Sequence, residues 1–272
     1  MSTLADRYPS ALVTGASTGL GAAFADMLLG EGIDTWGTSR DAARLAARPR
    51  LHALALDLTD GNAAERIFLD ADRAAGGFGI VVNNAGYGVF GGFAETDFGV
   101  WQTQLEVMLV NTARLARLAL RSMLARNRGA LVNVSSGAVR FPLPFQGAYN
   151  MAKAGLAALS ESLMVETAGT GVIVIDLQPG DYRTDFDRSV RRSPESFTSR
   201  QRRAWDAFAR MMRSGPPPPH AAAALRRALR RGRSGTVRTG RFFQAVAGPF
   251  LARFGPSSWI RAFLMRYFES AP

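Results

Sequence analysis

Short apolar runs that alternate with helical stretches constrain the fold of this chain more than any other feature. A run such as Ile80–Val82 is apolar at every position, which is typical of a strand buried on both faces of a parallel sheet. Segments of helical length separate these runs, and this alternation predicts an α/β fold with a doubly wound parallel sheet of about seven strands, flanked by helices. The expected strands are Ala11–Val13, Ile33–Thr38, His52–Leu56, Ile80–Val82, Gly129–Val134, Val172–Leu177 and Thr236–Thr239.

The composition excludes several classes of chemistry. The chain has 272 residues, of which 47% are hydrophobic, and it contains no cysteine. Disulfides, thiolate metal sites and cysteine nucleophiles are therefore excluded. Its two histidines, His52 and His220, are far apart in sequence, so we predict neither a metal site nor a Ser-His-Asp triad. Because there is no apolar signal segment and no run of spanning length, we expect a cytoplasmic protein.

We expect one domain over residues 1–272, with a core at 8–186 and a substrate-binding flap and C-terminal extension at 187–272. The net charge of +11 is concentrated in the extension, where 18 arginines stand against three acidic residues from Arg188 onward. Such asymmetry is compatible with nucleic acid, an anionic membrane surface or an acidic ligand. The charge alone does not decide among these partners.

A glycine-rich turn follows the first expected strand and precedes a helix, which is the order of a phosphate cradle. Gly15 permits a tight turn, Gly19 lets the backbone approach a pyrophosphate, and Gly21 allows close helix packing. The alternative is that these glycines serve the turn only. The turn predicts a Rossmann-type dinucleotide site with the cofactor-binding residues Gly15, Ser17, Thr18, Gly19, Leu20 and Gly21.

The end of the second expected strand bears on the choice of cofactor. In dinucleotide-binding folds an acid at this point bonds the ribose hydroxyls of NAD, whereas a nearby arginine accepts the 2′-phosphate of NADP. This chain has Ser39 followed by Arg40, so we predict NADP(H) in preference to NAD(H). Asp41 could instead hold Arg40 in a local ion pair.

Tyr149 and Lys153 are four residues apart in an expected helix, so their side chains project from one face. Lys153 is the only lysine in a chain with 32 arginines. An ammonium beside a phenol favours the phenolate and lowers the pKa of the tyrosine, which makes it a usable general acid or base. Taken alone, the pair is also compatible with an ordinary helical Tyr and Lys.

Together the motifs resemble those of the short-chain dehydrogenase/reductase family over roughly residues 11–186. Within it, Pro144–Tyr149 and Gln178–Phe186 are most similar to the hydroxysteroid-dehydrogenase-like and acyl-dihydroxyacetone-phosphate-reductase-like branch. The residues that carry the family resemblance are Thr14, Gly15, Gly19, Gly21, Asn83, Asn84, Ala85, Gly86, Asn111, Ser136, Tyr149, Lys153, Pro179 and Gly180.

The resemblance implies a role for each matched residue. Tyr149 is expected to protonate the substrate carbonyl, with Lys153 lowering its pKa and holding the nicotinamide ribose. Ser136 is expected to hydrogen-bond the substrate oxygen, and Asn111 to position a water in a proton relay. The remaining cofactor contacts that it implies are Asp57 and Leu58 at the adenine, Asn83, Ala85 and Gly86 at the adenosine ribose, and Pro179, Gly180 and Thr184 at the nicotinamide.

The family pattern fades after Thr184, where we expect the substrate to be selected. Helices are expected at Ser199–Arg213 and Ala221–Arg231, separated by a proline run. The aromatic, arginine-punctuated segment Phe242–Phe268 has three interpretations: core packing, a substrate lid with a dimer contact, or peripheral contact with an anionic membrane. All three imply an apolar pocket, hence a hydrophobic substrate.

We therefore expect an oxidoreductase that interconverts a hydrophobic ketone or aldehyde and its alcohol with NADP(H). The family resemblance implies a homodimer or homotetramer. Two alternatives are a non-catalytic dinucleotide sensor and a basic protein associated with nucleic acid or a membrane surface. The set of Asn111, Ser136, Tyr149 and Lys153 speaks against the first, and the lack of a nucleic-acid-binding motif speaks against nucleic acid as the partner.

Overall fold

A parallel sheet forms the centre of the computed structural model, which describes residues 3–241 and 256–268. Its seven strands lie in the order β3-β2-β1-β4-β5-β6-β7, and each adjacent pair is parallel. The order reverses between β1 and β4, the switch point at which such sheets bind ligands. The strands are β1 (Ser10–Val13), β2 (Asp34–Ser39), β3 (Leu51–Ala55), β4 (Ile80–Asn83), β5 (Gly129–Val134), β6 (Val172–Pro179) and β7 (Gly235–Thr239). The predicted fold class is confirmed.

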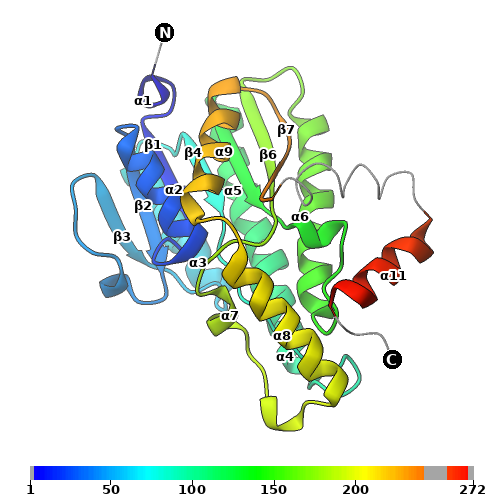
Figure 1. Cartoon of the computed structure of the whole chain (residues 1–272). Helices are drawn as coiled ribbons and strands as arrows, with labels where there is room; N and C mark the ends of the chain where they lie inside the picture. The colour runs from blue at the N-terminus through cyan, green and yellow to red at the C-terminus, as the bar shows by residue number, and fades with distance from the viewer. Residues whose placement is uncertain (1–2, 242–255, 269–272) are drawn as a thin grey trace.

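Helices cover both faces of the sheet and the carboxyl ends of its strands (Figure 1). One face carries α2 and α9, and the other carries α3, α5 and α6. The helices are α1 (Leu4–Arg7), α2 (Gly19–Gly30), α3 (Gly61–Ala74), α4 (Phe98–Leu105), α5 (Asn111–Ala125), α6 (Gly147–Glu166), α7 (Phe186–Ser189), α8 (Ser199–Ser214), α9 (Pro218–Arg231) and α11 (Ser257–Tyr267).

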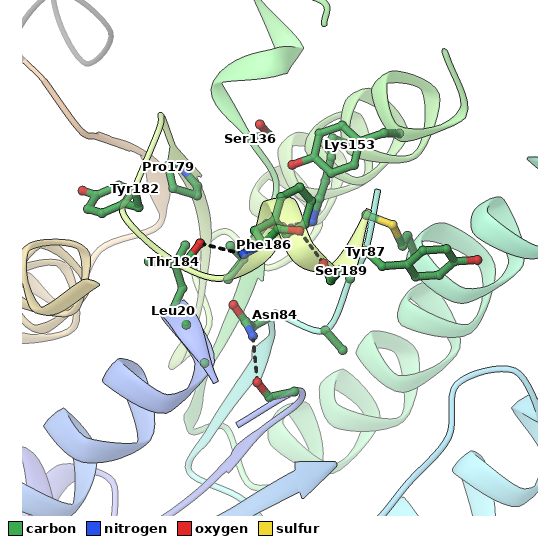
Figure 2. A pocket seen from close by; sticks show the side chains of 18 of the residues that line it. Leu20, Asn84, Tyr87, Ser136, Lys153, Pro179, Tyr182, Thr184, Phe186 and Ser189 are labelled. Atoms are coloured by element: carbon green, nitrogen blue, oxygen red, sulfur yellow. Dashed lines mark hydrogen bonds between the residues drawn. The ribbon is translucent and has the colours of Figure 1, made fainter. Parts of the chain in front are cut away.

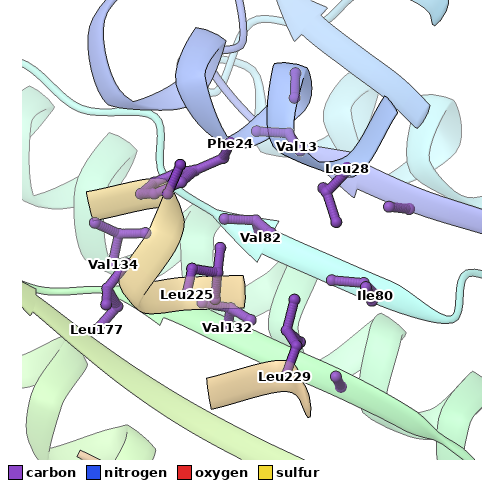
Figure 3. Packing of buried hydrophobic residues seen from close by; sticks show 14 of the residues in the cluster. Val13, Phe24, Leu28, Ile80, Val82, Val132, Val134, Leu177, Leu225 and Leu229 are labelled. Carbon is purple, nitrogen blue, oxygen red and sulfur yellow. The ribbon is translucent and has the colours of Figure 1, made fainter. Parts of the chain in front are cut away.

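An apolar cluster, which we call the front core, lies between the sheet and helices α2 and α9 (Figure 3). It brings together segments near the two ends of the chain. Phe24 and Leu28 of α2 are fully buried against the sheet, beside Leu225 and Leu229 of α9. Side chains of β1, β4, β5 and β6, Val82 among them, form the floor of this cluster. The helix that follows the glycine-rich turn is therefore fixed partly by residues of the C-terminal third.

Helices α3, α5 and α6 pack against the other face of the sheet and form a second apolar cluster with it, which we call the rear core. The single helix expected over Val100–Arg126 is instead α4, a π-helical turn at Glu106–Val110, and α5. The Thr112 hydroxyl donates to the carbonyl of Val107, five residues earlier, which is compatible with the wider turn. Because the turn is wider, Asn111 begins α5 with its side chain directed at the loop after β3.

A third apolar cluster lies under the segment between α7 and α9, which we call the flap (residues 186–215). Phe90, from the loop after β4, packs against Phe145, Phe197 and Trp205, with ring centroids 5.2–5.5 Å apart. Arg192 stacks on the ring of Trp205 at 4.1 Å. The arginine-rich flap is thus held to the rest of the molecule by a shared aromatic cluster.

Helix boundaries in the C-terminal third follow the expected signals. The Thr198 hydroxyl and the Gln201 side chain form a capping box that starts α8, which ends at Ser214 before the proline run. α9 begins at Pro218, three residues before the expected Ala221, because proline suits the first helical turn. Of the predicted aromatic segment, residues 242–255, including Phe242, Phe243, Phe250 and Phe254, lie outside the described part of the chain.

Candidate active site

The glycine-rich turn wraps the start of α2 at the carboxyl end of β1. Gly15 and Gly19 have φ values of +67° and +58°, which side chains rarely adopt. A Cβ on Gly21 would collide with the Gly15 carbonyl and lie 2.5 Å from the Asn84 amide. Thr18 makes no side-chain cap, so the first N–H groups of α2 face the cavity unblocked by a hydroxyl. This geometry fits a phosphate-binding turn.

Asn84 locks that turn to the loop after β4. Its amide donates to the carbonyl of Thr14 at 2.9 Å, and its backbone N–H donates to the Thr14 hydroxyl at 2.9 Å. Asn83 behaves differently, because its side chain lies within the rear face of the sheet and donates to Asn133 at 2.9 Å. Asn83 does not line the cavity described below, whereas Asn84, Ala85 and Gly86 do.

Tyr149 and Lys153 lie one turn apart on α6, and both are buried. The Lys153 ammonium donates to the carbonyl of Val134 at 2.7 Å and lies 5.9 Å from the Tyr149 ring centroid. Ser136 follows β5, and its hydroxyl accepts from the N–H of Ala138 at 3.0 Å. Two ammonium protons remain for other acceptors. Figure 2 shows Lys153 and Ser136 above the loop that bears Thr184 and Phe186.

Burial dominates the acid–base properties of the pair. It raises the pKa of Tyr149 above its ordinary value, and hydrogen bonding with Ser136 opposes this effect. It also lowers the pKa of Lys153 to about 8, against the attraction of Asp176. The expectation that Lys153 brings the pKa of Tyr149 toward neutrality stays a prediction, because burial raises this pKa and the largest opposing effect comes from Ser136.

Asn111 is buried at the start of α5, and its amide donates to the carbonyl of Leu58 at 2.8 Å. It is absent from the cavity lining, so its side chain ties α5 to the loop after β3. The water-positioning role stays a prediction.

The adenosine end of the site lies beyond β2 and β3. Ser39, Arg40, Asp57 and Leu58 all line the cavity, as expected. The Asp41 carboxylate accepts from the N–H of Ala43 at 3.0 Å and makes no ion pair with Arg40. Arg40 therefore remains exposed at the cavity edge. Arg44 is a second arginine at this end of the cavity, and it is not among the site residues predicted from the sequence. Its position in the short 3₁₀ helix that follows Arg40 is the signal that could have indicated it.

The nicotinamide end of the site follows β6. The N–H of Gly180 donates to the carbonyl of Thr239 at 2.7 Å, which anchors the Pro179–Gly180 loop to β7. The Tyr182 hydroxyl bonds both Thr239 and His220, at 2.7 and 2.8 Å. Thr184 lies against Gly19, within 3.5 Å of where a Cβ there would be. The loop between β6 and the flap thus lies over the phosphate turn.

One cavity of about 700 Å³ joins these parts. Of the predicted site residues it collects Gly15, Ser17, Thr18, Gly19, Leu20, Gly21, Ser39, Arg40, Asp57, Leu58, Ala85, Gly86, Ser136, Tyr149, Lys153, Pro179, Gly180 and Thr184. Its lining also includes apolar residues outside the motifs, which come from the loop before α6, the flap and α11: Phe141, Leu143, Phe186, Phe208, Met212, Phe263 and Leu264. Phe186 contacts the Tyr149 ring edge-to-face at 5.9 Å.

Metal-ligand clusters and membrane-spanning helices are absent from residues 3–241 and 256–268. No group of three or more metal-ligating side chains converges there. No helix in that part of the chain has the length and apolarity needed to cross a membrane. The contact of the C-terminal segment with a membrane surface stays a prediction.

The geometry defines a class of protein, one whose Rossmann-type sheet carries a candidate dinucleotide-binding cavity at its switch point. The family model described as short chain dehydrogenase matches residues 9–195, and the chain belongs to this family.

Known relatives agree with this assignment. A short chain dehydrogenase of Pseudocercospora fijiensis is 32% identical over 187 residues, which are 65% of this chain and 60% of the relative. The chain thus spans about three fifths of that relative's length. A short chain dehydrogenase/reductase of Burkholderia phymatum, solved in complex with NAD, is 25% identical with a TM-score of 0.79, covering 90% of this chain and 91% of its own. A metagenomic short-chain oxidoreductase, solved in complex with NADP, is 27% identical with a TM-score of 0.65, covering 84% and 96%.

Proposed function

We propose that the protein reduces a hydrophobic ketone or aldehyde, or oxidises the corresponding alcohol, with NADP(H) as the preferred cofactor. The observation that carries the proposal is the single cavity, in which Tyr149, Lys153 and Ser136 lie between a phosphate-binding turn and an apolar chamber. The bound dinucleotide supplies or accepts the hydride. The protein residues bind and orient the cofactor and the substrate, and they protonate the substrate oxygen.

In reduction, the Tyr149 phenol donates its proton to the carbonyl oxygen of the substrate. The Ser136 hydroxyl donates a hydrogen bond to the same oxygen, which holds the carbonyl in place while charge develops there. Lys153, anchored by the Val134 carbonyl, directs its remaining protons toward the nicotinamide ribose and the phenol. Its positive charge stabilises the phenolate left after proton transfer.

The preference for NADP(H) rests on Arg40 and Arg44. Both line the adenosine end of the cavity, and no carboxylate pairs with Arg40 within the described residues. A 2′-phosphate can accept charge-assisted hydrogen bonds from such guanidinium groups. A carboxylate at Ser39, which would repel that phosphate, is absent from this sequence.

The hydrophobic substrate rests on the other end of the cavity. Phe186 and Leu143 border the catalytic tyrosine, while Phe208, Met212 and Phe263 come from α8 and α11. Such a chamber binds an apolar body and leaves one oxygen for Ser136 and Tyr149. We also propose that the protein acts as a homodimer or homotetramer, on the family resemblance alone.

A panel of ketones, aldehydes and alcohols, followed by NADPH absorbance, tests the proposal. Tyr149→Phe should lower kcat by about 10²–10⁴-fold, the range for loss of a general acid, and keep NADPH binding. Tyr8→Phe removes the same hydroxyl from a buried tyrosine outside the cavity and is the matched control. Turnover by Tyr149→Phe equal to that of the control would refute the mechanism.

Cofactor choice is tested separately. Arg40→Ala should raise the KM for NADPH by about 10–100-fold, because a hydrogen bond to a charged group contributes about 1.5–3 kcal/mol, and should change the KM for NADH little. Arg48→Ala is the matched control, because Arg48 pairs with Asp26 at 2.6 Å and does not line the cavity. Equal losses for both cofactors in Arg40→Ala would refute the NADP(H) assignment.

A further inference from the structure

A buried carboxylate near Lys153 has no part in the chemistry described so far. Asp176 lies in β6 with no exposed surface. Alternation along the strand sends Val172 and Val174 into the rear core, so Asp176 is on that same face, which α6 covers. An acid at this position is unusual, because the strands of a parallel sheet are normally apolar on both faces.

The partners of Asp176 indicate that it is ionised. The Ser135 hydroxyl donates to one carboxyl oxygen at 2.5 Å, and the Gln178 amide donates to the other at 2.7 Å. Burial raises the pKa of this carboxyl, and the hydrogen bonds that both oxygens accept oppose this effect because they favour the carboxylate. A buried charge costs several kcal/mol unless a cation compensates it. A cation that compensates the charge of Asp176 is therefore expected nearby.

The neighbours across the sheet are neutral. Strand register places Asn83, Asn133, Asp176 and Thr236 side by side on β4, β5, β6 and β7. The Asn83 amide donates to Asn133, and the Asn133 amide donates to Ser160 of α6, both at 2.9 Å. Neither amide donates to a charged group. The acid in the row therefore calls for another explanation.

Lys153 is the cation that faces Asp176. Its ammonium is bonded to the carbonyl of Val134, and Asp176 is bonded to the hydroxyl of the next residue, Ser135. The two groups are thus held at adjacent residues at the end of β5 without forming a direct ion pair. The attraction opposes the loss of charge on Lys153 caused by burial. Because no ammonium proton is spent on the carboxylate, the remaining two stay available to the active site.

Other ionisable groups around the pair carry no positive charge. Tyr149 and Glu161 approach from α6, and Asp181 approaches Tyr149 from the loop after β6. Glu161 accepts from the Thr236 hydroxyl at 2.6 Å, and its charge adds to burial, the larger effect, in raising the pKa of Asp176. None of these groups can replace Lys153 as the compensating cation.

We propose that Asp176 is a positioning residue of the active site, a buried carboxylate clamped by Ser135 and Gln178 that keeps Lys153 protonated in its apolar surroundings. The role of that charge in turnover rests on the proposed function. The electrostatic interaction between Asp176 and Lys153 does not rest on the proposed function.

The single lysine makes the proposal directly measurable. Protein grown with ¹³C-labelled lysine gives one Cε resonance, because Lys153 is the only lysine in the chain. Its chemical shift against pH reports the ionisation of Lys153 without substrate, cofactor or turnover. The variants are Asp176→Asn, which keeps hydrogen-bonding capacity, and Asp176→Leu, which suits the apolar surroundings. Asp187→Asn removes one negative charge from α7, outside the cavity, and is the matched control.

The wild-type Lys153 resonance should titrate near pH 8. Either folded Asp176 variant should titrate about one pH unit lower, the low end of the effect of a nearby opposite charge, and Asp187→Asn should match the wild type. A lower melting temperature of an Asp176 variant is not evidence for the proposal, since any substitution of a buried residue can cause it. Titration of both Asp176 variants within about 0.3 units of the wild type, or an equal shift in Asp187→Asn, would overturn the proposal.

A kinetic arm links the pairing to turnover. In a folded Asp176 variant, the alkaline loss of kcat/KM for the carbonyl should also begin about one pH unit lower than in the wild type. A lysine resonance that shifts while the rate profile does not would overturn the catalytic part of the proposal. A wild-type protein without turnover would refute the proposed function, and the resonance would still decide whether Asp176 keeps Lys153 charged.

Discussion

Gly21 and Gly30 lie in the same helix, α2, and a methyl group added to each has opposite expected effects. At Gly30 a Cβ would meet nothing within 4 Å. Gly30→Ala should therefore gain the ordinary helical advantage of alanine, about 0.5–1 kcal/mol. For a chain of this length, that corresponds to a rise in Tm of about 1–3 °C.

At Gly21 the same methyl group meets the phosphate turn. The Asn84 amide nitrogen would lie 2.5 Å and the Gly15 carbonyl carbon 2.8 Å from the new Cβ, where ordinary contact begins at 3.4 Å. Because the Gly15 carbonyl oxygen would lie closer still, Asn84 and Gly15 must move by at least roughly 0.9 Å, at a cost of about 1–3 kcal/mol. The displacement also strains the Asn84 hydrogen bond to Thr14 and moves the N–H groups that would bind phosphate.

Thermal melting and NADPH titration of the two variants give the comparison. Gly21→Ala should lower the Tm by several degrees and weaken NADPH binding at least about tenfold, since 1.4 kcal/mol corresponds to a factor of ten. Gly30→Ala should bind NADPH as the wild type does. If Gly21→Ala were as stable as Gly30→Ala and bound NADPH equally well, the assignment of this turn as the phosphate site would be wrong.

Two further predictions concern the catalytic residues. Phe186→Ala should raise the KM for a hydrophobic ketone about tenfold, because the ring that packs on Tyr149 is lost from the chamber. Phe98→Ala removes an exposed ring outside the cavity and should leave this KM unchanged. Equal KM values for the two variants would contradict the assignment of the chamber. The pKa of Lys153 is lower in the folded protein, at about 8, than its ordinary 10.5, so the unfolded state binds more protons between these values and stability should rise with pH there. The gain should be about 2 kcal/mol between pH 7 and 9.5 in urea unfolding of the wild type and should be absent in Lys153→Met; a rise of the same size in Lys153→Met would show that another group causes it.

The fold could be predicted because its signals are local. A run such as Val172–Leu177 is apolar at consecutive positions except for one acid, and helices of the right length separate such runs. The glycine-rich turn could be predicted because it requires backbone angles at Gly15 and Gly19 that favour glycine.

The parts that sequence did not predict depend on contacts between distant segments. The two adjacent amides at Asn83 and Asn84 are indistinguishable by motif, and only strand alternation sends one into the sheet and the other to the turn. The π-helical turn before Asn111 changes which way its amide points. Phe186 and Phe208 became part of the cavity through the flap, whose position is set by Phe90 and the bridge between Val89 and Arg191.

The burial of Leu225 and Leu229 against α2 bears on how the chain is made. During synthesis the strands that match the family emerge first, and they present the front face of the sheet before α9 exists to cover it. Until residues 218–231 leave the ribosome, side chains such as Ile175 and Leu177 lack their final neighbours on that face. Folding of this protein is therefore delayed until most of the chain is available, and fragments that stop before α9 should be prone to aggregation.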